Sequence, residues 1–188
     1  MHSVWKTSIL FTLVTALLLG IGYPLVVTGI AAVVFPHKSA GSLILKNGQV
    51  IGSELLAQSF TSDRYFHPRP SAAGNGYDAT ASGGSTLAQS NAKLVGRIQG
   101  DIDKLSVANP GKPVPIDMVT TSGSGLDPDI TPDNADYQAA RVAKARSLGE
   151  DQVRKLIAEH TSSRQFGILG EPRVNVLVLN LALDGLAK

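Results

Sequence analysis

The feature that most constrains this chain is an uncharged apolar stretch near its start, Thr7 to Phe35. As a helix rising about 1.5 Å per residue it would be roughly 40 Å long, more than the ~30 Å hydrocarbon core of a bilayer. Backbone amides in lipid must find partners within their own segment, so the stretch predicts one transmembrane helix. Tyr23-Pro24, with Gly20 and Gly22, is expected to kink this helix, because proline removes a backbone donor.

Two other interpretations of the stretch are weaker. A core helix of a soluble domain is not expected to be this long with no polar face. A cleaved signal peptide would also have a basic residue such as Lys6. Its apolar region, however, would span only ~7–15 residues and end at a small-residue cleavage site, which the sequence lacks. We therefore expect a short cytoplasmic tail (1–6), an uncleaved anchor (7–35) and one domain (36–188).

The side of the membrane on which that domain lies is only weakly indicated by charge. Lys6 precedes the span while Lys38 and Lys46 follow it, so the positive-inside bias is near balance. A short tail followed by a long domain is the usual layout of a signal anchor. This layout favours a single-pass protein of the cell membrane with an extracytoplasmic domain.

Composition excludes several classes of function. The formal net charge is only +2 and the charges are interspersed, which leaves no basic block for nucleic acid. Aromatic residues make up 5% of the chain, too few for a base-stacking surface. Cysteine is absent, which rules out disulfides, thiol nucleophiles and cysteine zinc sites together.

Local patterns after the anchor predict a mixed α+β domain. Apolar runs on both sides of Asn47-Gly48 predict a β-hairpin, since Asn-Gly suits a type I′ turn. Ser53 is expected to cap a short helix over 54–58. Residues 61–91, rich in Gly, Ser and Pro but carrying aromatic rings, predict an ordered loop without regular structure. A helix over 92–105 and a strand over 114–119 follow.

The last third of the chain carries the clearest helix signals. Thr131 is a good N-cap and Pro132 fits the first helical position, so a helix is expected from there to Arg146. A second helix begins near Glu150. A buried strand is expected over 172–183, with room for a short turn of helix at its end. The fold class predicted is a single amino-terminal transmembrane helix plus one α+β domain, a small mixed sheet with helices on one face.

Candidate chemistry in the sequence is sparse. The segment Ser122–Gly125 has the glycine and serine content of an anion nest but lacks the Gly-Lys-Ser/Thr of a P-loop. Ser82–Ser85 shows a weak likeness to the Ser-Gly-Gly signature of transporter ATPases. Acidic residues over 127–133 alternate as in a calcium loop, but Pro132 replaces the sharp-turn glycine and Gln138 the closing glutamate. We therefore expect no catalytic residue and no metal site.

Several blocks appear together and in order along the chain: the apolar span, Val50-Ile-Gly-Ser53, Tyr65-Phe66-x-x-Arg69-Pro70-Ser71-Ala72, Val119-Thr-Thr-Ser-Gly-Ser-Gly-Leu-Asp-Pro128, Gln138-x-x-Arg141-Val-Ala-x-Ala-Arg146 and Gly170-Glu-Pro-Arg-Val-Asn-Val-Leu177. This combination closely resembles the C subunit of the potassium-transporting Kdp P-type ATPase of bacteria and archaea. One departure is Ser85–Gln89, where the family pattern has Ser-Asn-Leu-Gly-Pro or similar.

The resemblance implies an accessory subunit that is not an enzyme in its own right. Its implied partners are a channel-like potassium-translocating subunit, an ATP-hydrolysing subunit and a very small membrane subunit, with lipid around the anchor. The family is described as a catalytic chaperone that raises the ATP affinity of the hydrolysing subunit, and as lying near the external entrance of the channel-like subunit. ATP and potassium are then handled by the complex, with no cofactor held by this chain.

The resemblance and the residue patterns together give two sets of candidate residues, and the sequence assigns no nucleotide-binding residues. The candidate functional loop comprises Ser122, Gly123, Ser124, Gly125, Leu126, Asp127 and Pro128. The candidate partner contacts are Gly20, Gly22, Gly29, Tyr65, Phe66, Arg69 and Pro70. The alternative function is an independent membrane-anchored enzyme or ligand-binding protein of the cell envelope.

Overall fold

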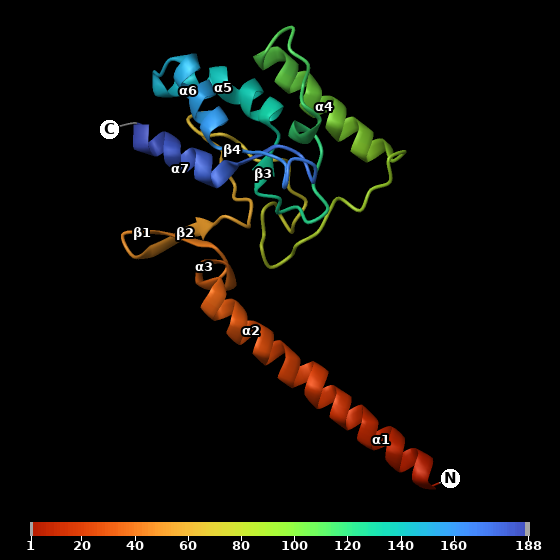
Figure 1. Ribbon diagram of the computed structural model, residues 1–188. Coiled ribbons are helices and arrows are strands. Elements are labelled where there is room, and N and C mark those ends of the chain that lie inside the picture. The colour runs from red at the N-terminus through yellow and green to blue at the C-terminus, as the bar shows by residue number, and fades with distance from the viewer. Residues whose placement is uncertain (1, 187–188) are drawn as a thin grey trace. The chain divides into compact units, whose positions relative to one another are not determined.

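A computed structural model describes residues 2–186, and its chain divides into two compact units (Figure 1). The first unit runs to Ile51 and the second begins at Gly52.

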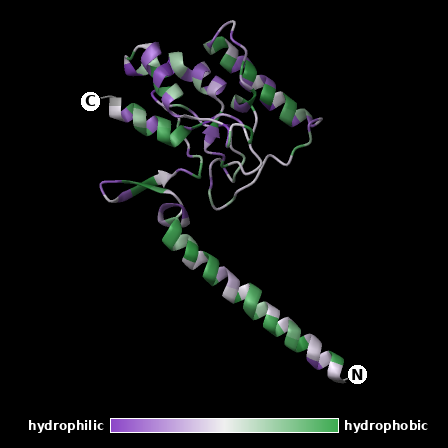
Figure 2. Ribbon diagram, in the orientation of Figure 1, coloured by the Kyte–Doolittle hydropathy of each residue, from purple (hydrophilic) through white to green (hydrophobic). Residues whose placement is uncertain are grey.

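The first unit begins with one continuous helical run. It consists of α1 (His2–Leu17), a π-helical turn η1 (Leu18–Gly22) and α2 (Tyr23–Val34). Over Ser3–Val34 this run is long and apolar enough to cross a membrane, and Figure 2 shows it almost entirely in hydrophobic and neutral colours. The predicted apolar helix is therefore present.

Just before Tyr23-Pro24, where a kink is expected, the helix contains a π turn. The N–H of Tyr23 bonds to the carbonyl of Leu18, five residues back, in place of the usual four. Pro24 has no N–H to donate and would crowd the carbonyl four residues before it. Widening the preceding turn relieves this crowding, and the helix continues beyond it.

A short helix α3 (Pro36–Ser39) leads into the predicted β-hairpin, β1 (Leu43–Lys46) and β2 (Gln49–Ser53). Asn47 and Gly48 have φ of 53° and 77°, the two positive values of a type I′ turn. The hairpin prediction is confirmed. The helix predicted over 54–58 is wrong: the chain makes a turn there, with the Leu55 N–H donating to the Ser53 hydroxyl. So few residues cannot offset the cost of helix nucleation.

The middle of the chain is mostly irregular. Residues 61–91, all of them described, contain no helix or strand, as predicted. Helix α4 (Ala92–Ala108) follows, capped by the Asn91 side chain. The strand predicted over 114–119 is wrong, because the chain forms the short 3₁₀ helix η2 (Ile116–Met118). Pro113 and Pro115 deprive this segment of the backbone donors that a strand needs.

Helices α5 (Pro132–Arg146) and α6 (Glu150–Glu159) begin where the sequence predicts them. Thr131 caps α5 by accepting the N–H of Asn134. Three short antiparallel strands form a sheet in the order β3-β5-β4: β3 (Asp129–Ile130), β5 (Arg173–Asn175) and β4 (Thr161–Ser162). The register pairs Ile130 and Thr161 with Val174 from opposite sides.

The strand predicted over 172–183 is wrong for most of its length. Only Arg173–Asn175 is a strand, and helix α7 (Val176–Leu186) replaces the rest. The buried residues Val176, Leu179 and Leu183 are three and four positions apart, which is the helical period.

The hydrophobic core lies where α5, α6 and α7 meet the small sheet. Phe66, from the irregular loop, fills this core and is fully buried. Among residues 2–186 the core takes no member from α4. The predicted fold class, an apolar amino-terminal helix and an α+β domain, is confirmed, although the domain contains more helix and less strand than the sequence suggests.

Candidate functional site

The first part of the candidate site is an irregular segment, Asp63–His67, that we call the strap. It belongs to no helix or strand, yet all five of its carbonyl groups accept hydrogen bonds from side chains of α5 and α7. The strap contains Tyr65 and Phe66, two of the predicted contact residues, and it leads directly into Arg69 and Pro70.

Two side-chain amides clamp the carboxyl-terminal end of the strap. Asn180 accepts the N–H of Phe66 (2.8 Å) and donates to the Phe66 carbonyl (3.0 Å). Gln138 does the same for His67, at 2.8 and 3.0 Å. Each amide thus presents a donor and an acceptor to one residue, as a neighbouring strand would. This satisfies the backbone of a segment that has no strand partner.

Two arginines of α5 hold the start of the strap. Arg141 donates to the carbonyls of Asp63 (2.8 Å) and Tyr65 (3.0 Å). The side chain of Arg146, only 1% exposed, donates to the Arg64 carbonyl (2.6 Å) and pairs with Asp184 (2.8 Å). Its guanidinium also lies over the Tyr65 ring, 4.9 Å from the centroid. The burial of this charge is therefore compensated by an ion pair and hydrogen bonds.

The second part of the site is a contact among three irregular segments, Arg69–Ala73, Ser82–Gly84 and Ser122–Asp127, which we call the three-loop platform. Ser71 donates its hydroxyl to the Gly125 carbonyl (2.6 Å), and the Gly83 N–H donates to the Ser124 carbonyl (2.8 Å). The structure thus brings the predicted functional loop against the segment that follows the strap.

Gly125 is the tightest point of the platform. Its φ is +67°, and a Cβ built there would lie 2.5 Å from the Gly83 carbonyl oxygen and 2.7 Å from the Ala73 nitrogen. Only glycine fits such a backbone conformation and such a close approach. Leu126 beside it is buried, and its carbonyl accepts the N–H of Ala57. The loop is held in one conformation by its neighbours on both sides.

Charges beside the platform are paired. Arg69 bonds to Asp127 (3.0 Å), and Arg173 to Asp129 (3.1 Å). Burial and the nearby Asp127 carboxylate raise the pKa of Asp129, against the opposing effect of Arg173. These four residues line a small open groove of about 320 Å³. Asp127 and Asp129, two of the aspartates that resembled a calcium loop, therefore form ion pairs, and Thr131 caps α5.

The platform carries no arrangement for nucleophilic catalysis. Among the described residues, the hydroxyls of Ser122 and Ser124 contact each other (3.3 Å) and no histidine or carboxylate. Within residues 2–186, no three histidine or acidic side chains come together as a metal site would require. What the arrangement provides chemically is a rigid polar surface, built from exposed serines on a fixed backbone.

The glycines of the anchor divide between two faces of the helix. Gly22 and Gly29 are seven residues apart and lie on one face, because seven residues make nearly two turns. Gly20 lies two residues before Gly22 in the π turn and is therefore on a different face of the helix. A Cβ at Gly20 or Gly29 would meet no atom of this chain within 4 Å. Gly22 and Gly29 together could admit the backbone of a neighbouring helix.

Comparison with known proteins agrees with this layout. A model of the family described as "K+-transporting ATPase, c chain" matches residues 5–185, from the anchor to α7. The chain belongs to this family. Proteins named potassium-transporting ATPase KdpC subunit are its relatives. One from Koribacter versatilis is 57% identical over 179 residues, which cover 95% of this chain and 93% of that protein. One from Acidobacterium capsulatum is also 57% identical over 179 residues, covering 95% and 96%.

The chain is thus a KdpC-type subunit of a potassium-transporting ATPase, and the motifs of the resemblance meet in space. One of these motifs supplies Gln138, Arg141 and Arg146, whose side chains hold the strap. The strap itself contains the start of another motif, Tyr65-Phe66. Sequence reasoning missed Asn180, the fourth residue whose side chain holds the strap. A signal for it existed, because Asn180 stands alone as an amide in the apolar run Val176–Leu183. A buried amide of this kind needs partners, and the strap provides them.

Proposed function

We propose that this chain is the accessory subunit of a high-affinity ATP-driven potassium uptake pump, where it supports assembly and stimulates the ATP-hydrolysing subunit. The observation that carries the proposal is the family match over residues 5–185, which includes both the anchor and the domain. The geometry supports it in a second way. The residues of the shared motifs are used to fix the strap and the three-loop platform, which suits a docking surface better than a reaction site.

The proposed partners are the channel-like potassium-translocating subunit, the ATP-hydrolysing subunit and the very small membrane subunit. We place the domain outside the cytoplasm, near the external entrance of the channel-like subunit. ATP is then on the other side of the membrane, and one helix cannot place the domain on both sides. Any effect on ATP affinity must pass through the anchor or through assembly.

The function is tested by comparing pumps with and without this chain. The other subunits should assemble poorly in its absence, and their potassium-stimulated ATPase turnover should recover when the full chain is added. Unchanged assembly and turnover in pumps that lack the chain would contradict the proposal. A chain that binds the pump but leaves turnover unaltered would support the assembly role alone.

The side of the membrane is tested with a single cysteine, since the natural chain has none. Lys112 is exposed, and Lys112→Cys should react with a membrane-impermeant thiol reagent in intact cells whose outer barrier is absent or permeabilised. Labelling only after the cell membrane is lysed would place the domain inside the cytoplasm. The unsubstituted chain is the control for labelling of other proteins.

The anchor is tested with two matched glycine variants. Gly22→Leu should weaken co-purification with the channel-like subunit, because leucine on the Gly22–Gly29 face keeps a neighbouring helix at a distance. Gly20→Leu makes the same change on a different face and should have a smaller effect. Equal effects of the two variants would contradict a packed Gly22–Gly29 face.

A further inference from the structure

Two turns of this chain share nearly the same pair of positive φ angles but have very different residues. The hairpin turn Asn47-Gly48 has φ of 53° and 77°, and the turn Phe166-Gly167, between β4 and β5, has φ of 54° and 77°. In the second turn the Ile168 N–H donates to the Gln165 carbonyl (3.2 Å). Asparagine is among the residues most often found at positive φ, whereas a bulky phenylalanine there is an outlier. The backbone conformation therefore does not explain why residue 166 is a phenylalanine.

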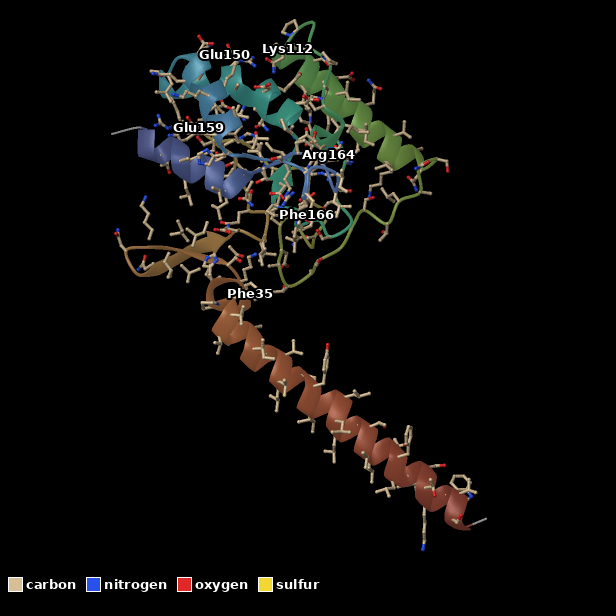
Figure 3. All side chains as sticks on the ribbon, in the orientation of Figure 1. Phe35, Lys112, Glu150, Glu159, Arg164 and Phe166 are labelled. Atoms are coloured by element: carbon tan, nitrogen blue, oxygen red, sulfur yellow. The ribbon has the colours of Figure 1, made fainter. Side chains whose placement is uncertain are left out.

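Packing in the hydrophobic core does not explain Phe166 either. The Phe166 side chain is 90% exposed, and its neighbours Ile168 and Leu169 are 76% and 54% exposed. We call residues 165–169 the apolar tip, and Figure 3 labels Phe166 on it. Three adjacent apolar side chains in water contribute little to folding, since apolar groups stabilise a fold when they leave the solvent.

The apolar tip has a regular, hydrogen-bonded frame. Gln165 and Leu169 exchange two backbone hydrogen bonds (2.8 and 2.9 Å), and Arg164 forms an ion pair with Glu171 across the stem. Both ends of the stem lead into strands of the three-stranded sheet. The phenyl ring is thus carried at the end of a two-stranded projection from the domain, which reduces the ordering cost of inserting it elsewhere.

We propose that the apolar tip inserts the Phe166 ring into an apolar, uncharged recess of another subunit of the potassium-transporting ATPase. The inference rests on the proposed function in one respect, that the chain works inside the assembled pump. The anchor already holds the domain beside the other subunits, so this second contact forms at high effective concentration.

Charge and size favour this occupant over two others. Within residues 163–171, all of them described, the charged side chains are Arg164 and Glu171, which neutralise each other. A loop that binds an anionic lipid surface would present unpaired basic residues. A second copy of the chain would need roughly 800 Å² of surface on each partner, which three tip residues do not supply. An uncharged recess in a partner that is already tethered fits both the neutral charge of the tip and its small area.

The test replaces Phe166 with the residue that the turn prefers. Phe166→Asn removes the exposed ring and keeps the backbone, so the full chain in detergent should unfold at the same temperature as the wild type or higher. Its retention by the other subunits of the pump should fall at least ~10-fold, as expected when one large apolar side chain no longer becomes buried. Phe166→Leu should retain part of the affinity.

The matched control is Ile116→Asn, which removes another exposed apolar side chain, 74% exposed and remote from the apolar tip in sequence. It should leave retention unchanged. Equal retention of Phe166→Asn and wild type would overturn the inference while leaving the proposed function intact. If the wild-type chain itself is not retained by the other subunits, the proposed function fails instead.

A fluorescent probe distinguishes the occupants. Phe166→Cys gives the chain a single cysteine for an environment-sensitive dye. A shift to shorter wavelength when the other subunits are added in detergent supports the recess. The same shift in vesicles that contain only this chain would assign the tip to lipid, and a shift that depends on chain concentration would assign it to a second copy. Either result, or no shift in the complex, overturns the proposal.

Discussion

The strap and helix α4 belong to the same unit but are held in opposite ways. The strap has no regular secondary structure, yet its backbone makes seven hydrogen bonds to side chains of α5 and α7, and Phe66 is fully buried. Helix α4 is regular over its whole described length and has no buried residue. An open groove of about 590 Å³ lies between its carboxyl-terminal end and α5.

The few bonds that hold α4 come from single side chains. Arg97 donates to the Val119 carbonyl (2.9 Å), and the Tyr137 hydroxyl donates to the Leu105 carbonyl (2.8 Å). The comparison teaches that regular structure and local stability are separate properties. Stability follows buried apolar area and satisfied polar groups, and an irregular segment can have more of both than a helix.

The largest effect expected is that of Phe66→Ala. It should lower the free energy of unfolding of the full chain by about 3–5 kcal/mol, because a phenyl ring is removed from a closed core. Val95→Ala, on α4 and 53% exposed, should cost less than about 1 kcal/mol. Denaturant unfolding in detergent measures both. Similar losses in free energy of unfolding for the two variants would contradict the difference in stability between the strap and α4.

The next effect concerns the platform beside the strap. Gly125→Val should destabilise the chain by about 3 kcal/mol and impair assembly, because valine can neither adopt the positive φ nor avoid the Gly83 carbonyl. Ser124→Ala removes one neutral hydrogen bond and should cost only about 0.5–1.5 kcal/mol. The assembled pump with Ser124→Ala should keep most of its potassium-stimulated ATPase turnover. Loss of turnover with assembly intact would point to a chemical role for Ser124.

A glycine change of opposite sign is expected in α4. A Cβ at Gly96 would meet no atom within 4 Å, and the residue lies inside a helix, so Gly96→Ala should stabilise the chain by about 0.5–1 kcal/mol. Hydrogen exchange should show α4 amides opening more readily than those of α5, and the difference should narrow in the variant. Exchange as slow in α4 as in α5 of the wild type would contradict the loose packing of α4.

The smallest effect is a pH dependence at the end of the strap. Burial, and then the Arg141 charge, lower the pKa of His67 below its usual value of about 6.5. Between the folded and unfolded pKa values the unfolded chain binds more protons, so this contribution to stability is complete above about pH 6.5 and declines below it. His67→Gln keeps the backbone contacts with Gln138 and should flatten that decline in unfolding midpoints. An unchanged pH profile would show that the ring is not the cause.

Much of the fold could be predicted because its signals are local. Thr131-Pro132 fixes the start of α5, and Asn47-Gly48 fixes the hairpin turn, each within four residues. The strap could not be predicted in the same way, since Phe66 and Asn180 are 114 residues apart and follow no period. Helix α7 was mistaken for a strand because short apolar runs look alike in either state.

The candidate site was anticipated only as separate pieces. The sequence pointed to the loop 122–128 and to Tyr65–Pro70, and the structure brings the two together through Ser71 and Gly125. It also places Phe66 in the core, so that this residue positions the strap from beneath. Which surface a partner covers depends on residues of that partner, and no pattern within one chain contains that information.

The π turn in the anchor has a consequence for how the helix meets its surroundings. A π turn adds one residue to a helical turn, which rotates every following side chain by about 100° relative to an uninterrupted α-helix. The face that α1 turns toward a neighbour is therefore not continued by α2. One continuous helical run can in this way present α1 to one transmembrane neighbour and the Gly22–Gly29 face to another.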